Sequence, residues 1–239
     1  MIYRNKFPKE LSKLSFNECE EISKRVSSHF QANLKQQHID EDLSSQLNNI
    51  YIPLAATLFE MTKRQTSALV IGVNGAQGSG KSTLCALLET ILQEGFGLKT
   101  TSFSIDDVYC TRSERLDASK HIHPLLVTRG VPGTHYIALG MNLLDQLKQQ
   151  EADCEVAIPV FDKAIDDRTN PDSWRKVITP FDLILFEGWC VGSKPQEESS
   201  LIAPINALEA EEDADSTWRS HVNQRLRDDY AKLYARLDL

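Results

Sequence analysis

A short glycine-rich stretch combines residue types at spacings that suit phosphate binding. The run Gly75-Ala76-Gln77-Gly78-Ser79-Gly80-Lys81-Ser82 fits the pattern G-x-x-x-x-G-K-[ST] at every fixed position, and Thr83 follows it. In this pattern the glycines let backbone amides surround an anion, the lysine reaches the β- and γ-phosphates, and the serine hydroxyl faces Mg²⁺. We therefore predict that residues 75–83, the P-loop, bind ATP with Mg²⁺, Thr83 lying toward the α-phosphate.

Carboxylates follow two later apolar runs. Asp106 and Asp107 come directly after residues 100–105, and Glu187 comes directly after residues 181–186. Acids at the carboxyl ends of parallel strands lie near a bound phosphate, because ligands bind at that edge of the sheet. Asp106 and Asp107 are candidates for a catalytic base or for water-mediated Mg²⁺ binding, and Glu187 for positioning the metal or the nucleophile. The alternative for the aspartates is a pair of solvated turn carboxylates.

Basic residues lie in the segments between these runs. Residues 111–135 form a glycine-punctuated stretch with little apolar periodicity, and Arg129 lies within it. A long irregular stretch beside a phosphate site suggests substrate binding. Further on, Lys163 and Arg168 could hold a substrate carboxylate or neutralise the transferring phosphoryl group. Each could equally be an ordinary surface charge.

The elements that must position these residues are predicted from apolar periodicity. Short apolar or β-branched runs predict strands; they cover residues 68–71, 100–105, 156–161 and 181–186. Apolar residues at three- and four-residue steps predict helices; they lie within residues 10–66, 84–91, 137–150 and 217–237. This order predicts an α/β fold of the P-loop NTPase type, a mostly parallel sheet flanked by helices. Residues 1–66 would form a helical N-terminal extension packed on a core domain of residues 67–239.

The bulk composition excludes several classes of protein. The chain has 239 residues and a net charge of -8, which makes a broad nucleic-acid surface unexpected. It contains no run long enough to span a membrane, and its N-terminus lacks the apolar core of a signal peptide. The five cysteines are scattered without C-x-x-C spacing, which favours reduced thiols. We expect a cytoplasmic protein that binds no membrane and no nucleic acid.

Several blocks in this order resemble the D-glycerate 3-kinase family, small P-loop kinases related to uridine kinase, phosphoribulokinase and pantothenate kinase. The resemblance runs from about residue 50 to the C-terminus. The blocks that carry it are Gly75 to Thr83, Ser104-Ile105-Asp106-Asp107-Val108-Tyr109, Arg129-Gly130-Val131-Pro132-Gly133-Thr134-His135, Ile158-Pro159-Val160-Phe161-Asp162-Lys163-Ala164 with Asp167-Arg168, and Phe186-Glu187-Gly188-Trp189-Cys190-Val191-Gly192. Together these blocks are far more specific than the P-loop alone.

The resemblance implies phosphoryl transfer from ATP-Mg²⁺ to a hydroxyl of a small acid, D-glycerate giving 3-phosphoglycerate. It implies that Lys81 and the loop amides hold the phosphates, and that Ser82 and Glu187 hold or support the metal. Asp106 or Asp107 would accept the hydroxyl proton. The residues implied on the substrate side are Arg129, His135, Lys163 and Arg168.

Two departures from the family pattern accompany the resemblance. Relatives commonly carry an acid after the Gly-Thr-His sequence, where this chain has Tyr136. The family also continues for about fifty residues past the last helix, so the domain is expected to be C-terminally short. Two alternatives follow: a kinase of another hydroxylated metabolite, pantothenate- or nucleoside-like, and a nucleotide-binding module without catalysis.

Overall fold

The computed structural model describes residues 14–239, and its centre is a three-stranded parallel sheet in the order β1-β7-β2. The strands are β1 (Leu69–Asn74), β7 (Leu183–Gly188) and β2 (Thr100–Ser104). All residues of β7 are buried, as expected for the central strand of a sheet covered on both faces. The predicted parallel sheet is thus confirmed.

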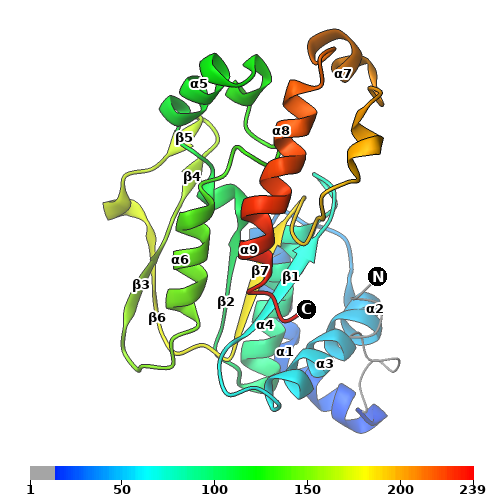
Figure 1. Cartoon of the computed structure of the whole chain (residues 1–239). Helices are drawn as coiled ribbons and strands as arrows, with labels where there is room; N and C mark the ends of the chain where they lie inside the picture. The colour runs from blue at the N-terminus through cyan, green and yellow to red at the C-terminus, as the bar shows by residue number, and fades with distance from the viewer. Residues whose placement is uncertain (1–13) are drawn as a thin grey trace.

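Side chains alternate between the two faces of this sheet and divide the core in two. On β7, Leu183 and Leu185 belong to one apolar cluster, while Ile184 and Phe186 belong to the other. This alternation follows from the two-residue period of a strand. Helices cover both faces, which gives a three-layer arrangement (Figure 1).

One face is covered by helices from the N-terminal part of the chain and by the helix that follows the P-loop. They are α1 (Phe16–Gln36), α2 (Ser44–Gln46), the π-helix η2 (Leu47–Tyr51), α3 (Ile52–Thr62) and α4 (Lys81–Phe96). Helix α1 packs along α4, where Gly95 permits a close approach: a Cβ added there would lie 3.1 Å from side-chain atoms of Ile22 and Val26. The helices predicted for residues 10–66 are confirmed over the described residues; the part before Leu14 lies outside them.

The other face is covered by helices from the second half of the chain. They are α6 (Ile137–Leu147) and the continuous C-terminal helix α8 (Thr217–Arg225), η7 (Leu226–Tyr230) and α9 (Ala231–Tyr234). Leu143, Leu144, Tyr230 and Leu233 are among the residues that these helices bury against the sheet. None of the helices in the described part of the chain is long and apolar enough to cross a bilayer.

The remaining elements lie in the segments between these strands and helices. They are the 3₁₀-helices η3 (Ile105–Val108), η4 (Pro124–Val127), η5 (Pro171–Ser173) and η6 (Glu198–Leu201), the helices α5 (Arg112–His121) and α7 (Ala207–Glu212), and the strands β3 (Glu155–Ile158), β4 (Phe161–Asp162), β5 (Asp167–Arg168) and β6 (Arg175–Ile178). The apolar run at residues 156–161 does not join the parallel sheet. Instead β3 pairs antiparallel with β6, and β4 pairs antiparallel with β5.

Candidate active site

The register of the sheet brings the carboxyl ends of its three strands together. Glu187 on β7 lies between Val73 of β1 and Ser104 of β2. The segments that follow β1 and β2 are the P-loop and η3, which carries Asp106 and Asp107. Residues from three distant parts of the sequence therefore meet at one edge of the sheet, where parallel α/β folds bind their ligands.

The P-loop connects β1 to α4 by a backbone that its glycines make possible. Gly78 and Gly80 have φ values of 73° and 85°, a left-handed region that side chains with a Cβ rarely adopt. Helix α4 begins at Lys81, so the free N–H groups of its first turn face the loop. The Lys81 ammonium donates a hydrogen bond of 3.0 Å to the Ala76 carbonyl. This arrangement fits a nucleotide phosphate, because the backbone amides of the loop, the N-terminus of α4 and the Lys81 ammonium all favour an anion.

A serine and a glutamate next to the P-loop offer oxygen ligands for a cation. The Ser82 hydroxyl donates to Oε1 of Glu187 over 2.8 Å, and Glu187 is only 7% exposed. Carboxylate and hydroxyl oxygens suit Mg²⁺, which commonly takes one or two protein ligands beside phosphate oxygens and water. The pair fits the predicted metal position.

Asp106 and Asp107 have different environments although they are consecutive. Oδ2 of Asp107 accepts the Ser104 amide at 2.9 Å and so closes the start of η3. Burial raises the pKa of Asp107 to about 6, and the charges of Asp106 and Glu187 add to this rise. Asp106 instead faces a pocket, where its Oδ2 lies 2.7 Å from the Lys163 ammonium.

This pocket, which we name the basic pocket, has a volume of about 420 Å³. Its lining combines a P-loop residue with residues of η3, α5, the end of η4, the segments that follow η3 and η4, and the β4–β5 turn. They are Gln77, Asp106, Tyr109, Arg112, Arg115, Val127, Thr128, Arg129, Lys163 and Asp166. A cavity of this size is in the range used for small-molecule ligands. Because Gln77 belongs to the P-loop, the pocket opens directly beside the predicted nucleotide site.

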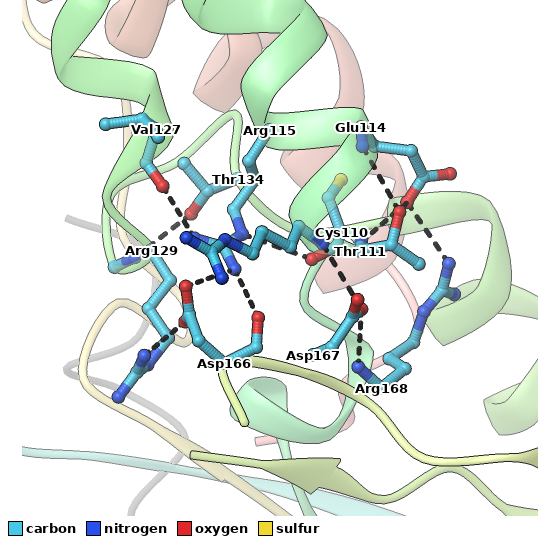
Figure 2. A network of polar contacts seen from close by, with 12 residues as sticks. Cys110, Thr111, Glu114, Arg115, Val127, Arg129, Thr134, Asp166, Asp167 and Arg168 are labelled. Carbon is cyan, nitrogen blue, oxygen red and sulfur yellow. Dashed lines mark hydrogen bonds and ion pairs between the residues drawn. The ribbon is translucent and has the colours of Figure 1, made fainter. Parts of the chain in front are cut away.

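One wall of the basic pocket is a network of arginines and an aspartate (Figure 2). The Arg115 side chain, 2% exposed, donates to the backbone carbonyls of Cys110, Val127 and Asp166 and lies 2.9 Å from the Asp166 carboxylate. Asp166 also forms an ion pair with Arg129. Partial burial alone would raise the pKa of Asp166, but the two arginines lower it below its usual value. The network fixes the β4–β5 turn against α5.

The predicted substrate residues divide into two pairs. Arg129 and Lys163 line the basic pocket, whereas His135 and Arg168 are not among its lining residues. His135 is 1% exposed, stacks on Tyr109 with ring centroids 4.3 Å apart, and hydrogen-bonds the Tyr230 hydroxyl. Burial lowers its pKa to about 3. The structure thus places His135 behind Tyr109 and outside the pocket lining, and its predicted substrate contact stays a prediction.

Arg168 has partners outside the basic pocket. Its guanidinium lies 3.2 Å from the Glu114 carboxylate and 5.3 Å from the centre of the Tyr136 ring. The aromatic residue at position 136 thus packs against this arginine. The ion pair and the cation–π contact connect β5 to α5 and to the start of α6, and the substrate contact predicted for Arg168 stays a prediction.

Several pocket residues were not predicted as substrate contacts. Arg112 and Arg115 lie in the basic stretch at residues 111–135, and Tyr109 ends the block that contains Asp106. Asp166 and Gln77 also line the pocket, although Gln77 was predicted only for the nucleotide. The signal for the arginines was the basic character of the stretch. Which of its side chains turn toward the pocket depends on how α5 is placed.

The fold is that of a P-loop kinase. Residues 47–236 match the model of the KAP family P-loop domain. The chain belongs to this family.

Several known proteins similar to this chain are kinases by name. An uncharacterized kinase, mug58 of Schizosaccharomyces pombe, is 30% identical over 204 residues, which cover 81% of this chain and 71% of that protein. The chloroplastic D-glycerate 3-kinase of Arabidopsis thaliana is 33% identical over 134 residues, covering 53% of this chain and 29% of that protein. A solved structure, D-glycerate 3-kinase from Cryptococcus neoformans, superposes with a TM-score of 0.63 at 27% identity and covers 78% of this chain and 69% of that one.

Proposed function

We propose that this protein is an ATP-dependent kinase that transfers the γ-phosphoryl group to a hydroxyl of a small organic acid, with D-glycerate as the acceptor and 3-phosphoglycerate as the product. One observation carries the proposal. The basic pocket is lined by both Gln77 of the P-loop and Asp106, so a hydroxyl held near Asp106 lies beside the place for the terminal phosphate. Phosphoryl transfer requires mainly this positioning, together with neutralisation of charge.

The nucleotide side of the proposal rests on the P-loop and Glu187. The amides of residues 75–83 and the Lys81 ammonium bind the phosphates, and Ser82 and Glu187 hold Mg²⁺. When bound, Mg²⁺ neutralises charge on the β- and γ-phosphate oxygens. Because Ser82 and Glu187 already lie within 2.8 Å of each other, their positions need little rearrangement.

The acceptor side rests on Asp106. Its carboxylate takes the proton of the attacking hydroxyl as the new oxygen–phosphorus bond forms and the bond from the γ-phosphorus to the bridging oxygen breaks, which releases ADP. Lys163 pairs with Asp106 in this structure, its ammonium 2.7 Å from Oδ2 of that carboxylate. In this proposal Asp107 takes no proton. It caps η3 and so orients Asp106.

The choice of D-glycerate is supported by charge and by similarity. Arg129 and Lys163 give the pocket a cationic character suited to an acid. Two of the similar proteins are named D-glycerate 3-kinases. The partner is then a small hydroxy acid, and a nucleic acid or membrane is not required. A cytoplasmic location remains part of the same proposal.

We also propose that residues 67–239 are the kinase domain and that residues 1–66 are a helical extension which stabilises it. The contacts of α1 with α4 support this division, because Val26 and Phe30 of α1 are fully buried in the cluster that contains the apolar face of α4.

The experiment is an assay of ADP release by the purified protein with ATP-Mg²⁺ and a panel of acceptors. The panel contains D-glycerate, other hydroxy acids, pantothenate and nucleosides. We expect D-glycerate to stimulate ADP release, and Lys81→Ala to abolish the stimulation. Stimulation by another compound alone would overturn the choice of substrate, and nucleotide binding without any stimulated release would favour a non-catalytic module.

A further inference from the structure

The charges that line the basic pocket do not balance. Four cationic side chains and two carboxylates contribute to its lining. Asp166 is shared by Arg115 and Arg129, and Asp106 is paired with Lys163. Both carboxylates are therefore occupied by cations, and one cation remains. The remaining side chain is that of Arg112.

Arg112 is the first residue of α5, and its side chain is exposed at the pocket. Its backbone amide donates to Oδ1 of Asp167 over 3.2 Å, which fixes the start of the helix together with the capping box of Thr111 and Glu114. Within residues 14–239, no hydrogen bond or ion pair is formed by its guanidinium. A cation in the first turn of a helix is unfavourable for the helix dipole, so this position costs some stability.

We infer that Arg112 determines the specificity of the basic pocket by binding the carboxylate of the acceptor. This inference rests on the proposed function. It assigns the carboxylate of a small hydroxy acid to Arg112 and its hydroxyl to Asp106, since both residues line the same cavity. Arginine suits the task because its planar guanidinium can donate two parallel hydrogen bonds to a carboxylate.

The other three pocket cations are already engaged. Arg115 is buried and its donors are taken up by three backbone carbonyls and Asp166. Arg129 shares the same carboxylate. Lys163 is paired with Asp106. It therefore lies close to the place proposed for the reacting hydroxyl rather than to the place proposed for the carboxylate of the acceptor. An acid entering the pocket thus gains most from Arg112, whose guanidinium loses no protein partner on binding.

The test compares an acid with its neutral amide. Binding of D-glycerate and D-glyceramide is measured by titration calorimetry at fixed ionic strength, with a non-hydrolysable ATP analogue and Mg²⁺ present. In Arg112→Gln we expect the affinity for D-glycerate to fall about 10- to 100-fold, while the affinity for the amide is unchanged, because only the charge-assisted contact is lost. Arg112→Lys should recover part of the loss.

The matched control is Lys120→Gln, a change of the same charge at the other end of α5, outside the pocket lining. It should bind both compounds as the parent protein does. Arg112→Gln should also keep or slightly raise the melting temperature, since it removes a cation from a helix N-terminus. Equal affinity of Arg112→Gln and the parent for D-glycerate would overturn the inference, and so would equal losses for the acid and the amide.

Turnover measured on the same samples separates this inference from the proposed function. If the parent protein phosphorylates D-glycerate and Arg112→Gln keeps its preference for the acid over the amide, the inference fails and the function stands. If the parent binds D-glycerate through Arg112 but transfers no phosphate, the function fails and the carboxylate site stands. If the parent binds no acid, both fail.

Discussion

Asp106 and Asp107 are adjacent in the chain, but their carboxyl groups have different partners. The carboxyl of Asp107 closes the start of η3 by accepting the Ser104 amide, and burial raises its pKa to about 6. The carboxyl of Asp106 lies at the basic pocket beside the Lys163 ammonium. The group that takes the proton must lie within reach of the substrate hydroxyl that receives the phosphoryl group, so geometry favours Asp106.

Replacement of each aspartate by asparagine tests this assignment. We expect Asp106→Asn to lower kcat about 10²- to 10⁴-fold, the usual contribution of a general base, with little change in ATP affinity. Asp107→Asn keeps an oxygen that can accept the Ser104 amide, so its kcat should fall much less. Steady-state kinetics and nucleotide binding measure both quantities, and an equal loss of kcat and ATP affinity in Asp106→Asn would point to a metal or structural role instead.

The raised pKa of Asp107 also predicts a dependence of stability on pH. Between about pH 4 and pH 6 the folded protein holds a proton on this carboxyl that the unfolded chain has released. The free energy of unfolding therefore falls as pH rises through this window. A shift of one pKa unit corresponds to about 1.36 kcal/mol, so the shift of Asp107 corresponds to a fall of up to about 3 kcal/mol. Above the pKa of Asp107 in the folded protein, the full stability penalty of its ionised, buried carboxyl is present.

Asp107→Asn removes this penalty. In the absence of nucleotide and metal, its melting temperature relative to the parent protein should therefore rise between pH 5 and pH 8. A difference in melting temperature that stays constant over this range would show that the Asp107 carboxyl titrates normally.

The positions of residues could be predicted from sequence where a backbone pattern decides them. Gly78 and Gly80 of the P-loop have positive φ angles, which favour glycine, and Gly80 is also a fixed position of the sequence pattern. His135 and Arg168 show the limit of such prediction. Both belong to blocks that resemble a kinase family, but one is buried behind Tyr109 and the other pairs with Glu114. Whether a polar side chain faces a pocket depends on packing between distant elements, which residue type alone does not encode.

At the scale of elements, Arg115 joins α5 to the segment after η4 and to the β4–β5 turn. Its buried guanidinium satisfies three carbonyls and the Asp166 carboxylate (Figure 2). We expect Arg115→Gln to lower the free energy of unfolding by about 3 kcal/mol, because buried acceptors lose their donors. It should also raise KM for the acceptor, since Arg129 and Lys163 belong to the elements that Arg115 positions.

Urea denaturation and steady-state kinetics check this expectation. The control is Arg227→Gln, which breaks an ion pair with Glu198 that is exposed on both sides and should leave stability unchanged. If Arg115→Gln proved as stable as this control, the network would not hold the pocket wall together.

The packing of α1 on α4 gives a second prediction at this scale. Phe30 is fully buried in the cluster shared by α1, α3, α4 and the sheet. Phe30→Ala should lower the free energy of unfolding by about 4 kcal/mol, whereas Ile50→Ala, at a side chain that is 55% exposed, should have little effect. Unfolding of the variant in a single transition would support one cooperative unit; loss of α1 alone, with the rest of the fold intact, would contradict it.

The strands of the parallel sheet could be predicted, but the pairing of residues 156–161 could not. The apolar runs before the P-loop and before Glu187 were recognisable as buried strands because both faces of the sheet are covered. The run at 156–161 is equally apolar, yet β3 pairs with β6 outside the sheet. A short apolar run predicts a strand without identifying its partner, which long-range packing selects.

At the scale of the whole molecule, charge is unevenly distributed. The net charge is -8, whereas four cations and two acids line the basic pocket. A local basic site on an acidic protein attracts small anions while the rest of the surface repels polyanions such as nucleic acids. The P-loop and the basic pocket lie at the carboxyl edge of β1, β7 and β2, the three strands at the centre of the fold in Figure 1.

The central claim is that phosphate moves from ATP to the primary hydroxyl of D-glycerate. Phosphorus NMR of a reaction with ATP, Mg²⁺ and D-glycerate tests it most directly. The account predicts a new phosphomonoester signal split into a triplet by the two protons of the adjacent CH₂ group, growing in step with ADP and absent with Lys81→Ala. A doublet would place the phosphate on the secondary hydroxyl. Inorganic phosphate alone, or no change in ATP, would contradict the account.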